Sequence, residues 1–287
     1  MPNTTVIAVV STKGGVGKTT LAANIGGLLA ALGQRVLLMD ADVGQASLTR
    51  CFRLAQHPTA GMADLIASGG LVQAHHFTPT TRPNLHIVAN NIGEDAQEFL
   101  RKRGDGQFII KRAVKSPLIR ERYDFVLIDT QGTKGDLQRC AATAADLLLS
   151  PFKPGPMELA EFKPGTLEML RSLNCMSDFM ADLRVGPVSV VINCAPRTTV
   201  ARHVSEHLRT EFRDEPGVRV LDTFLPDAKA YPEARALFTP VHESDPPGNT
   251  KVQLSGYEVM HRLVFELAPH LKGLWTGVNL DAMREAV

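Results

Sequence analysis

One glycine-rich segment near the start of the chain constrains the fold more than any other feature. Residues Thr12–Thr19 read TKGGVGKT, and they lie between the apolar run Val6–Val10 and the segment Thr19–Leu32, which is rich in alanine and leucine. A short β-branched run predicts a strand buried on both faces, and the second segment, ended by Gly33, predicts a helix. The glycine-rich segment is therefore predicted to be the turn of a strand–turn–helix unit.

This turn fits most of the phosphate-binding pattern G-x-x-x-x-G-K-[ST]. Gly17, Lys18 and Thr19 match its end, whereas Thr12 stands where the first glycine is expected. Glycine amides can point at phosphate oxygens, and the N-terminus of the helix adds a partial positive charge. We expect Lys18 to reach the β- and γ-phosphates and the Thr19 hydroxyl to bind Mg²⁺. The alternative, a glycine-rich turn that binds nothing, is disfavoured by the flanking strand and helix.

Further apolar runs alternate with helical segments along the chain. The predicted strands are Arg35–Met39, Leu85–Ala89, Phe125–Ile128, Leu147–Ser150 and Val188–Ile192, with Val220–Thr223 at an edge. The predicted helices are Ala96–Arg103, Phe108–Glu121, Gly135–Ala144, Glu158–Leu173, Val200–Phe212 and Ser255–Leu267, and His242–Thr250 is a predicted surface loop. This alternation predicts the α/β class: one domain over residues 1–287, with a single doubly wound, mostly parallel sheet and helices on both faces, as in P-loop NTPases.

Three aspartates follow predicted strands, at the edge where doubly wound sheets bind their ligands. Asp129 follows Phe125–Ile128 and is the predicted Mg²⁺ ligand, direct or through water. Asp40 and Asp42 follow Arg35–Met39, which we expect to lie next to the first strand. Asp40 is predicted to hold the metal together with Thr19 and Asp129. Asp42, which lies farther into the loop, is predicted to orient the attacking water. A loop-capping role remains the alternative for Asp40 and Asp42.

Composition excludes several classes of protein. The formal net charge is +1, so any binding to nucleic acid has to come from a local patch. The four cysteines lack the paired spacing of a disulfide framework or a zinc site, which favours a reducing compartment. Val6–Val10 is shorter than the apolar part of a signal peptide, and no run approaches the roughly 20 apolar residues of a spanning helix. We therefore expect a soluble, cytoplasmic protein.

The segment Lys13–Thr20, KGGVGKTT, resembles the deviant Walker A motif of the ParA/MinD group of ATPases. The similarity continues through DADVGQASLT (Asp40–Thr49), YDFVLIDTQG (Tyr123–Gly132), the segment from Ile192 to Val204, and DTFLPDAKAYPEA (Asp222–Ala234). These blocks span nearly the whole chain in family order. The sequence is most similar to the short ParA branch, which segregates plasmids, chromosomes or integrative elements.

The resemblance implies an ATPase that uses ATP and Mg²⁺, forms a sandwich homodimer when ATP is bound, and hydrolyses weakly without its partner. Lys13 would cross to the partner subunit's phosphates and neutralise charge in trans, as an arginine finger does. Catalysis would then rest on Lys13, Lys18 and Asp42. The nucleotide would contact the loop and the adenine-bordering positions: Lys13, Gly14, Gly15, Val16, Gly17, Lys18, Thr19, Thr20, Asn193 and Pro226.

The resemblance also implies DNA binding without sequence preference, release after hydrolysis stimulated by a ParB-like centromere-binding partner, and association with the nucleoid. The predicted DNA contacts are Arg197, Arg202, Arg209 and Lys229. Arg202 and Arg209 are seven residues apart and share a helical face, although a solvated helix face is the alternative reading. A second basic cluster, Arg101–Arg122, is expected to be a solvated helical surface, with contact to DNA or a partner as the alternative.

Two other functions stay open. A MinD-like ATPase would hold a membrane with a basic amphipathic tail, but the end of this chain has few basic residues beside Asp281 and Glu285. Membrane binding is therefore disfavoured. An ATP-dependent carrier or localisation scaffold is the second alternative. The chain also departs from the family pattern after the second strand, where Val43-Gly44 follows Asp42 in place of the usual Pro-Gln.

Overall fold

The computed structural model describes residues 4–42, 45–132, 135–177, 184–248 and 254–277. Within them one sheet has the strand order β3-β4-β2-β5-β1-β6-β7-β8, and every neighbouring pair is parallel except β3 and β4. The strands are β1 (Thr5–Val9), β2 (Val36–Ala41), β3 (Thr78–Pro79), β4 (Leu85–Val88), β5 (Phe125–Thr130), β6 (Leu147–Phe152), β7 (Val188–Ala195) and β8 (Val218–Pro226). The predicted doubly wound, mostly parallel sheet is confirmed.

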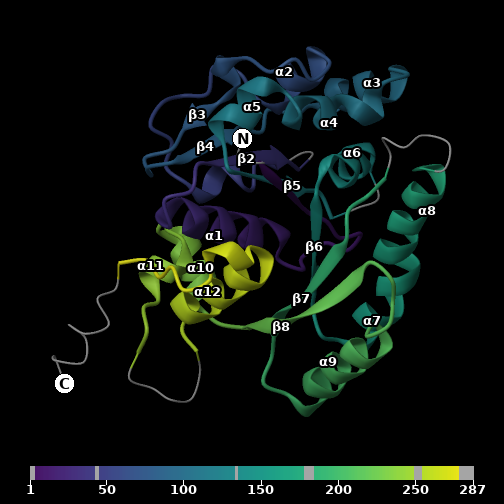
Figure 1. The fold of residues 1–287 in the computed structure, drawn as a ribbon, viewed down its shortest axis with the longest axis vertical. Coiled ribbons are helices and arrows are strands. Elements are labelled where there is room, and N and C mark those ends of the chain that lie inside the picture. The colour runs from purple at the N-terminus through teal and green to yellow at the C-terminus, as the bar shows by residue number, and fades with distance from the viewer. Residues whose placement is uncertain (1–3, 43–44, 133–134, 178–183, 249–253, 278–287) are drawn as a thin grey trace.

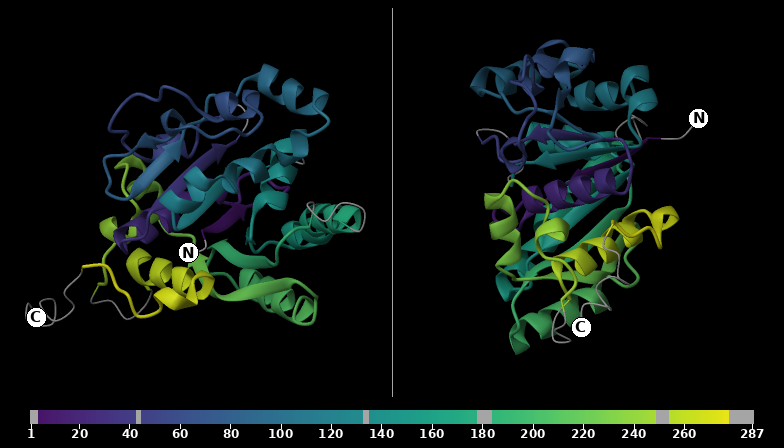
Figure 2. Two further views of the ribbon diagram at one scale, coloured as in Figure 1. Left: turned by 45° about the horizontal axis from the view of Figure 1, so that its top comes forward. Right: turned by 90° about the vertical axis from the view of Figure 1, so that its left-hand side faces the viewer.

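Helices cover both faces of this sheet (Figure 1). One face carries α2 (Met62–Ala67), α3 (Glu94–Lys102), α4 (Ile109–Val114), α5 (Pro117–Arg122), α6 (Asp136–Ala144), α7 (Pro156–Phe162), α8 (Glu168–Ser177) and α9 (Thr199–Glu211). The other carries α1 (Lys18–Ala31), α10 (Ala230–Ala236), α11 (Val241–Ser244) and α12 (Gly256–Leu267). Although α12 is far from α1 in the sequence, the two lie side by side in every view (Figures 1 and 2).

Alternating side chains of the central strands fill two separate cores. On β1, Val6 and Ala8 point into the core beneath α2–α9, while Ile7 and Val9 point into the core beneath α1 and α12. All four are at most 1% exposed. Successive side chains of a strand point to opposite faces of the sheet, so a parallel strand covered by helices on both faces needs apolar residues at every position. This arrangement fixes the end of β1, and so the start of the loop that follows it.

The prediction that the second strand lies next to the first was wrong. β2 does not lie next to β1, because β5 lies between them and pairs with both. The crossover through α1 therefore spans two strand positions. This insertion places Asp40 of β2 directly opposite Asp129 of β5 in the register, and Asp129 in turn opposite Val9. The two carboxylates therefore come from adjacent strands on one side of the loop.

Two further local predictions differ from the structure, and a third is confirmed. The helix expected over Phe108–Glu121 is interrupted, since α5 begins at Pro117 with Ser116 accepting a hydrogen bond from the backbone of Ile119. Proline suits the first turn of a helix and breaks its interior. The loop expected over His242–Thr250 was wrong at its start, where α11 buries His242; residues 249–250 lie outside the described residues. The edge strand Val220–Thr223 is confirmed within the longer β8.

Candidate nucleotide-binding site

The glycine-rich loop joins the end of β1 to the start of α1, and its backbone requires glycine. Gly15 and Gly17 have φ angles of 72° and 90°, in the left-handed region that favours glycine. A Cβ at Gly17 would lie 2.2 Å from Nδ2 of Asn193. Gly17 is also the N-cap of α1, so the unpaired amides of the first helical turn open towards the loop. The predicted anion cradle is therefore built from backbone groups.

Neighbouring strands and helices hold this loop in place. Asn193 of β7 is buried, and its amide donates to the carbonyl of Val16 at 2.7 Å. Gln138 of α6 donates to the carbonyl of Ser11 at 2.8 Å. The resemblance implied a place beside the adenine for Asn193, and that role stays a prediction. What the structure adds for Asn193 is a direct hydrogen bond that fixes the phosphate loop.

Lys18 points into the centre of the site. It is 7% exposed, and its amine lies 3.4 Å from the carbonyl of Lys13. Burial lowers the pKa of Lys18, while the carboxylates of Asp129 and Asp42 act in the opposite direction. The structure thus brings together this lysine and two of the three predicted aspartates at the mouth of the loop. Thr19 and Thr20 occupy the adjacent first turn of α1, both partly exposed.

Asp129 is the most perturbed carboxylate at the site. It is completely buried, and burial raises its pKa to about 7. Neither carboxylate oxygen has a hydrogen-bond partner among the described residues. The Thr19 hydroxyl and Lys18 lie near enough to lower the pKa in part, without meeting the geometry of a full hydrogen bond. A buried, unpaired carboxylate beside a hydroxyl is a donor set that fits Mg²⁺.

Asp40 is fully buried but, unlike Asp129, well satisfied. Its Oδ2 accepts from the backbone and the hydroxyl of Thr49, each at 2.7 Å, and its Oδ1 lies 3.4 Å from the amide of Asn90. Asn90 also donates its backbone N–H to the Thr49 hydroxyl at 3.0 Å. Asp40 therefore ties Thr49, at the far end of the loop that carries Asp42, to the sheet. Its predicted metal role stays a prediction. The contributions of Thr49 and Asn90 were missed: Thr49 ends the block Asp40–Thr49 but no spacing in it indicates a bond to Asp40, and Asn90 lies in none of the similar blocks.

Asp42 lies just past the end of β2 and is partly exposed. Burial and the neighbouring Asp40 raise its pKa, and Lys18 lowers it. Asp42 therefore faces the same space as Lys18, at the open side of the phosphate loop. Val43 and Gly44, where the sequence departs from the family pattern, lie outside the described residues.

Pro226, predicted near the adenine, and three of the four residues predicted to contact DNA lie at the outer edge of the sheet. Pro226 ends β8 and pairs with Ala195 of β7. It lines a groove of about 1180 Å³ between α9 and α12, which we call the β8 groove. Arg197, Arg202 and Arg209 line the same groove, whereas Lys229 is exposed at the start of α10. The groove also contains Arg262 and Lys272, two cations that sequence reasoning missed.

The side chain of Arg209 is hydrogen-bonded to the backbone of the edge strand β8. Its guanidinium donates to the carbonyls of Leu221 at 2.6 Å and Asp222 at 3.2 Å. From α12, Glu266 accepts from the backbone N–H groups of Asp222 at 2.9 Å and Thr223 at 2.7 Å. These side chains satisfy backbone groups that an edge strand otherwise leaves open to pairing. Arg209 therefore has a structural partner in addition to its predicted contact with DNA.

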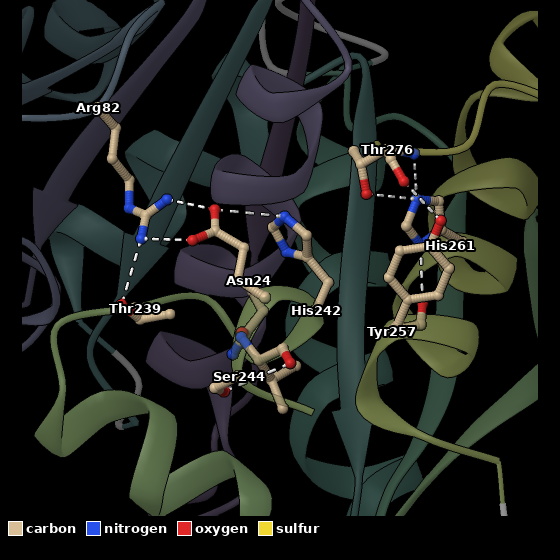
Figure 3. A network of polar contacts seen from close by, with 10 residues as sticks. Asn24, Arg82, Thr239, His242, Ser244, Tyr257, His261 and Thr276 are labelled. Atoms are coloured by element: carbon tan, nitrogen blue, oxygen red, sulfur yellow. Dashed lines mark hydrogen bonds and ion pairs between the residues drawn. The ribbon is translucent and has the colours of Figure 1, made fainter. Parts of the chain in front are cut away.

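On the opposite side of α1, a polar network holds α11 and α12 (Figure 3). Asn24 of α1 accepts from the backbone of Val241 at 2.6 Å, and Arg82 pairs with Glu243 of α11. Burial lowers the pKa of His242 to about 3, so this imidazole stays neutral. Sequence reasoning missed this network, which fixes the outer face of the helix that carries Lys18 and Thr19.

Comparison with known proteins shows the family to which the chain belongs. A protein-family profile described as "AAA domain" (AAA_31) matches residues 4–173, more than half of the chain. Sporulation initiation inhibitor protein Soj of Bacillus subtilis is 27% identical over 253 residues, covering 84% of this chain and 91% of Soj. Chromosome partitioning protein ParA of Caulobacter vibrioides is 28% identical over 239 residues, covering 82% and 85%. The chain belongs to the ParA/MinD family of P-loop ATPases.

A solved structure of this fold, the ATP complex of a Cyanothece McdA variant, superposes with a TM-score of 0.75 at 22% identity, covering 92% of this chain and 97% of McdA. Membership of the family makes this protein an ATPase that works with ATP and Mg²⁺. In the part of the chain that the structure describes, no set of three or more His, Cys, Asp or Glu side chains could hold a metal. No described helix is long and apolar enough to cross a membrane.

Proposed function

We propose that this ParA/MinD-family ATPase is a DNA-partitioning ATPase. In this proposal residues 1–287 form a single ATPase domain, two copies enclose ATP, and the dimer binds DNA without sequence preference. Hydrolysis, stimulated by a ParB-like partner, then releases the DNA. The observation that carries the nucleotide part is the buried and unpaired Asp129 beside Lys18 and Thr19, at the mouth of a glycine cradle. Cytoplasmic, nucleoid-associated localisation belongs to the same proposal.

The chemistry follows from the positions of the side chains. Thr19 and Asp129 would hold Mg²⁺, which neutralises charge on the phosphate oxygens when it is bound. Lys18 is aimed at the same oxygens, and the loop amides bind them through the backbone. Asp42, partly exposed on the open side of the loop, orients the attacking water. Lys13 of the second copy completes the charge around the transferred phosphate.

The lining of the β8 groove includes more cations (Arg197, Arg202, Arg209, Arg262 and Lys272) than carboxylates (Glu206, Asp222 and Glu266), and this excess of positive charge supports the DNA part of the proposal. Arg202, Arg262 and Lys272 are exposed there, so phosphate contacts would come from α9, α12 and the segment after it. Arg197 belongs to the same face, and Lys229 lies on α10. Contacts with about six phosphates would make the logarithm of the binding constant fall with the logarithm of salt concentration with a slope near −5.

A second candidate is the positioning of a protein assembly rather than a replicon. It is supported by the similarity to maintenance of carboxysome distribution protein A of Synechococcus elongatus, which is 35% identical over 146 residues, covering 49% of this chain and 55% of that protein. Membrane positioning, as in MinD-type proteins, stays a third and less favoured reading. All three use the same ATP switch and differ in the surface that the dimer holds.

Binding assays with arbitrary duplex DNA and with anionic liposomes separate these functions. Purified protein should bind the DNA only with ATP and Mg²⁺, and the Lys18→Ala variant should not bind it even with ATP and Mg²⁺. Arg202→Ala should weaken DNA binding and make the slope of the logarithm of the binding constant against the logarithm of salt concentration less steep by about one. Arg139 is exposed but lies outside the groove, so Arg139→Ala is the control and should change neither quantity. Equal retention on DNA with and without ATP, or binding to liposomes alone, would refute the partition proposal.

A further inference from the structure

The side chain of Lys13 is held by two carboxylates of its own chain. Its amine lies 3.2 Å from Oε1 of Glu158 and 2.9 Å from Oε2 of Glu161, both on α7. The two glutamates are three residues apart, so they lie on one face of that helix. Their hydrogen bonds, that of Glu161 foremost, raise the pKa of Lys13 and keep its amine charged. The lysine is about one-third exposed, so solvent and a second molecule can reach it.

A second contact fixes α7 against the phosphate loop. A π-helical turn, Lys163–Leu167, follows α7, and the Thr166 hydroxyl accepts from the backbone N–H of Thr12 at 3.2 Å. A Cβ at Gly165 would lie 2.6 Å from the Thr12 hydroxyl oxygen, so a side chain there would displace that hydroxyl. Single π-helical turns within α-helices are frequent at functional sites. The carboxylates that hold Lys13 are thus anchored to the residue that precedes it.

We propose that Glu158 and Glu161 are positioning residues, which hold Lys13 in cis until an ATP-bound dimer forms and the partner's phosphates replace them. The inference rests on the proposed function, because it needs Lys13 to act across the dimer. A single lysine amine cannot keep both carboxylates and also contact phosphates on another subunit. The two ion pairs therefore compete with dimerisation, and we call them the Lys13 latch.

The expected effect is moderate. Partly exposed ion pairs change an equilibrium by a factor of no more than about five each. The latch therefore raises the threshold for dimerisation and does not prevent it. Glu158→Gln/Glu161→Gln keeps the shape and polarity of both side chains while removing their charge. We expect this double variant to lower the dissociation constant of the dimer by about three- to twenty-fold.

Sedimentation equilibrium with Mg²⁺ and a non-hydrolysable ATP analogue measures that constant. Glu211→Gln is the matched control, because it removes a carboxylate from the neighbouring Lys163–Glu211 pair without touching Lys13. It should leave the constant unchanged. The single variant Glu161→Gln should show a smaller tightening in the same direction. A constant that is unchanged or higher in the double variant would overturn the proposal.

A double-mutant cycle with Lys13→Met separates the latch from a general effect of charge on α7. If the latch acts through Lys13, the glutamate substitutions should have no effect on dimerisation once the lysine is gone. The same decrease of the dimer dissociation constant in the Lys13→Met background would reject the latch and leave the proposed role of Lys13 in trans untouched. A Lys13→Met variant that dimerises and hydrolyses ATP like the original would instead reject the proposed role of Lys13 in trans.

Discussion

Replacing Asp129 by asparagine should stabilise the nucleotide-free protein and remove its Mg²⁺-dependent turnover. The folded state raises the pKa of this carboxyl from its ordinary value of 3.8 to about 7, chiefly through burial. Between those pH values the native state binds a proton that the unfolded state has released, so the free energy of unfolding falls as pH rises. Each pKa unit corresponds to 1.36 kcal/mol, which gives a loss of about 4 kcal/mol between pH 4 and pH 7 as an upper estimate.

Asparagine carries no charge, so it lacks this pH-dependent loss. Its buried amide lacks partners, which costs about 1–3 kcal/mol at every pH, and the net gain above pH 7 is then about 1–3 kcal/mol. The midpoint of thermal unfolding should rise by several degrees, on the order of 2 °C per kcal/mol. The turnover number should fall by at least about a hundredfold, because the carboxylate proposed to hold Mg²⁺ would lose its charge.

Urea unfolding at pH 4.5, 6 and 7.5 without nucleotide measures the difference in free energy between the Asp129→Asn variant and the original protein. That difference should grow in favour of the variant up to about pH 7 and then level off. Asp136→Asn, an exposed carboxylate paired with Arg101, is the control and should change the free energy by less than about 0.5 kcal/mol. A difference that does not depend on pH would refute the inference that Asp129 is destabilised by burial.

Three further outcomes follow from the site and its supports. Asp42→Ala should leave ATP binding intact in calorimetry and abolish phosphate release, and unchanged turnover would reject its role with water. Gly17→Ala should lose ATP affinity and about 2–3 kcal/mol of stability, because its φ is 90° and a Cβ would lie 2.2 Å from Nδ2 of Asn193; normal binding would contradict this geometry. Burial depresses the pKa of His242 to about 3, so the free energy of unfolding falls as pH falls below about 6.5. In urea unfolding, the original protein should lose up to about 1.4 kcal/mol more of this free energy than His242→Gln between pH 7.5 and pH 5.5. Equal losses in the two proteins would show that His242 is not held neutral.

The sequence predicted the parts of the site that depend on local spacing. Lys18 and Thr19 begin a helix and Asp129 lies near the carboxyl end of a strand, so their positions depend on a few neighbouring residues and on the rule that ligands bind at the carboxyl ends of parallel strands. The order of the strands could not be predicted in the same way. Nothing in Val6–Val10 or Arg35–Met39 indicates that β5, almost a hundred residues later, inserts between β1 and β2.

The missed features depend on contacts between distant segments. Asp40 was predicted as a metal ligand from its place after the predicted strand Arg35–Met39, but its hydrogen bonds with Thr49 and Asn90 follow from how two loops pack. Arg202 and Arg209 were expected on one helical face, and both line the β8 groove. The bonds of Arg209 to the edge of β8 depend instead on the side of the sheet that α9 covers. Helical periodicity carries no information on that point.

The central claim is that ATP held by Lys18 and the loop amides joins two copies of this chain. Sedimentation velocity of the Asp42→Ala protein tests it most directly, with ATP and Mg²⁺, with ADP and Mg²⁺, and with Lys18→Ala added. We predict twice the monomer mass with ATP, and the monomer mass with ADP or after the Lys18 change. A protein that stays monomeric while calorimetry shows ATP bound, or one that dimerises equally without ATP, would contradict the claim.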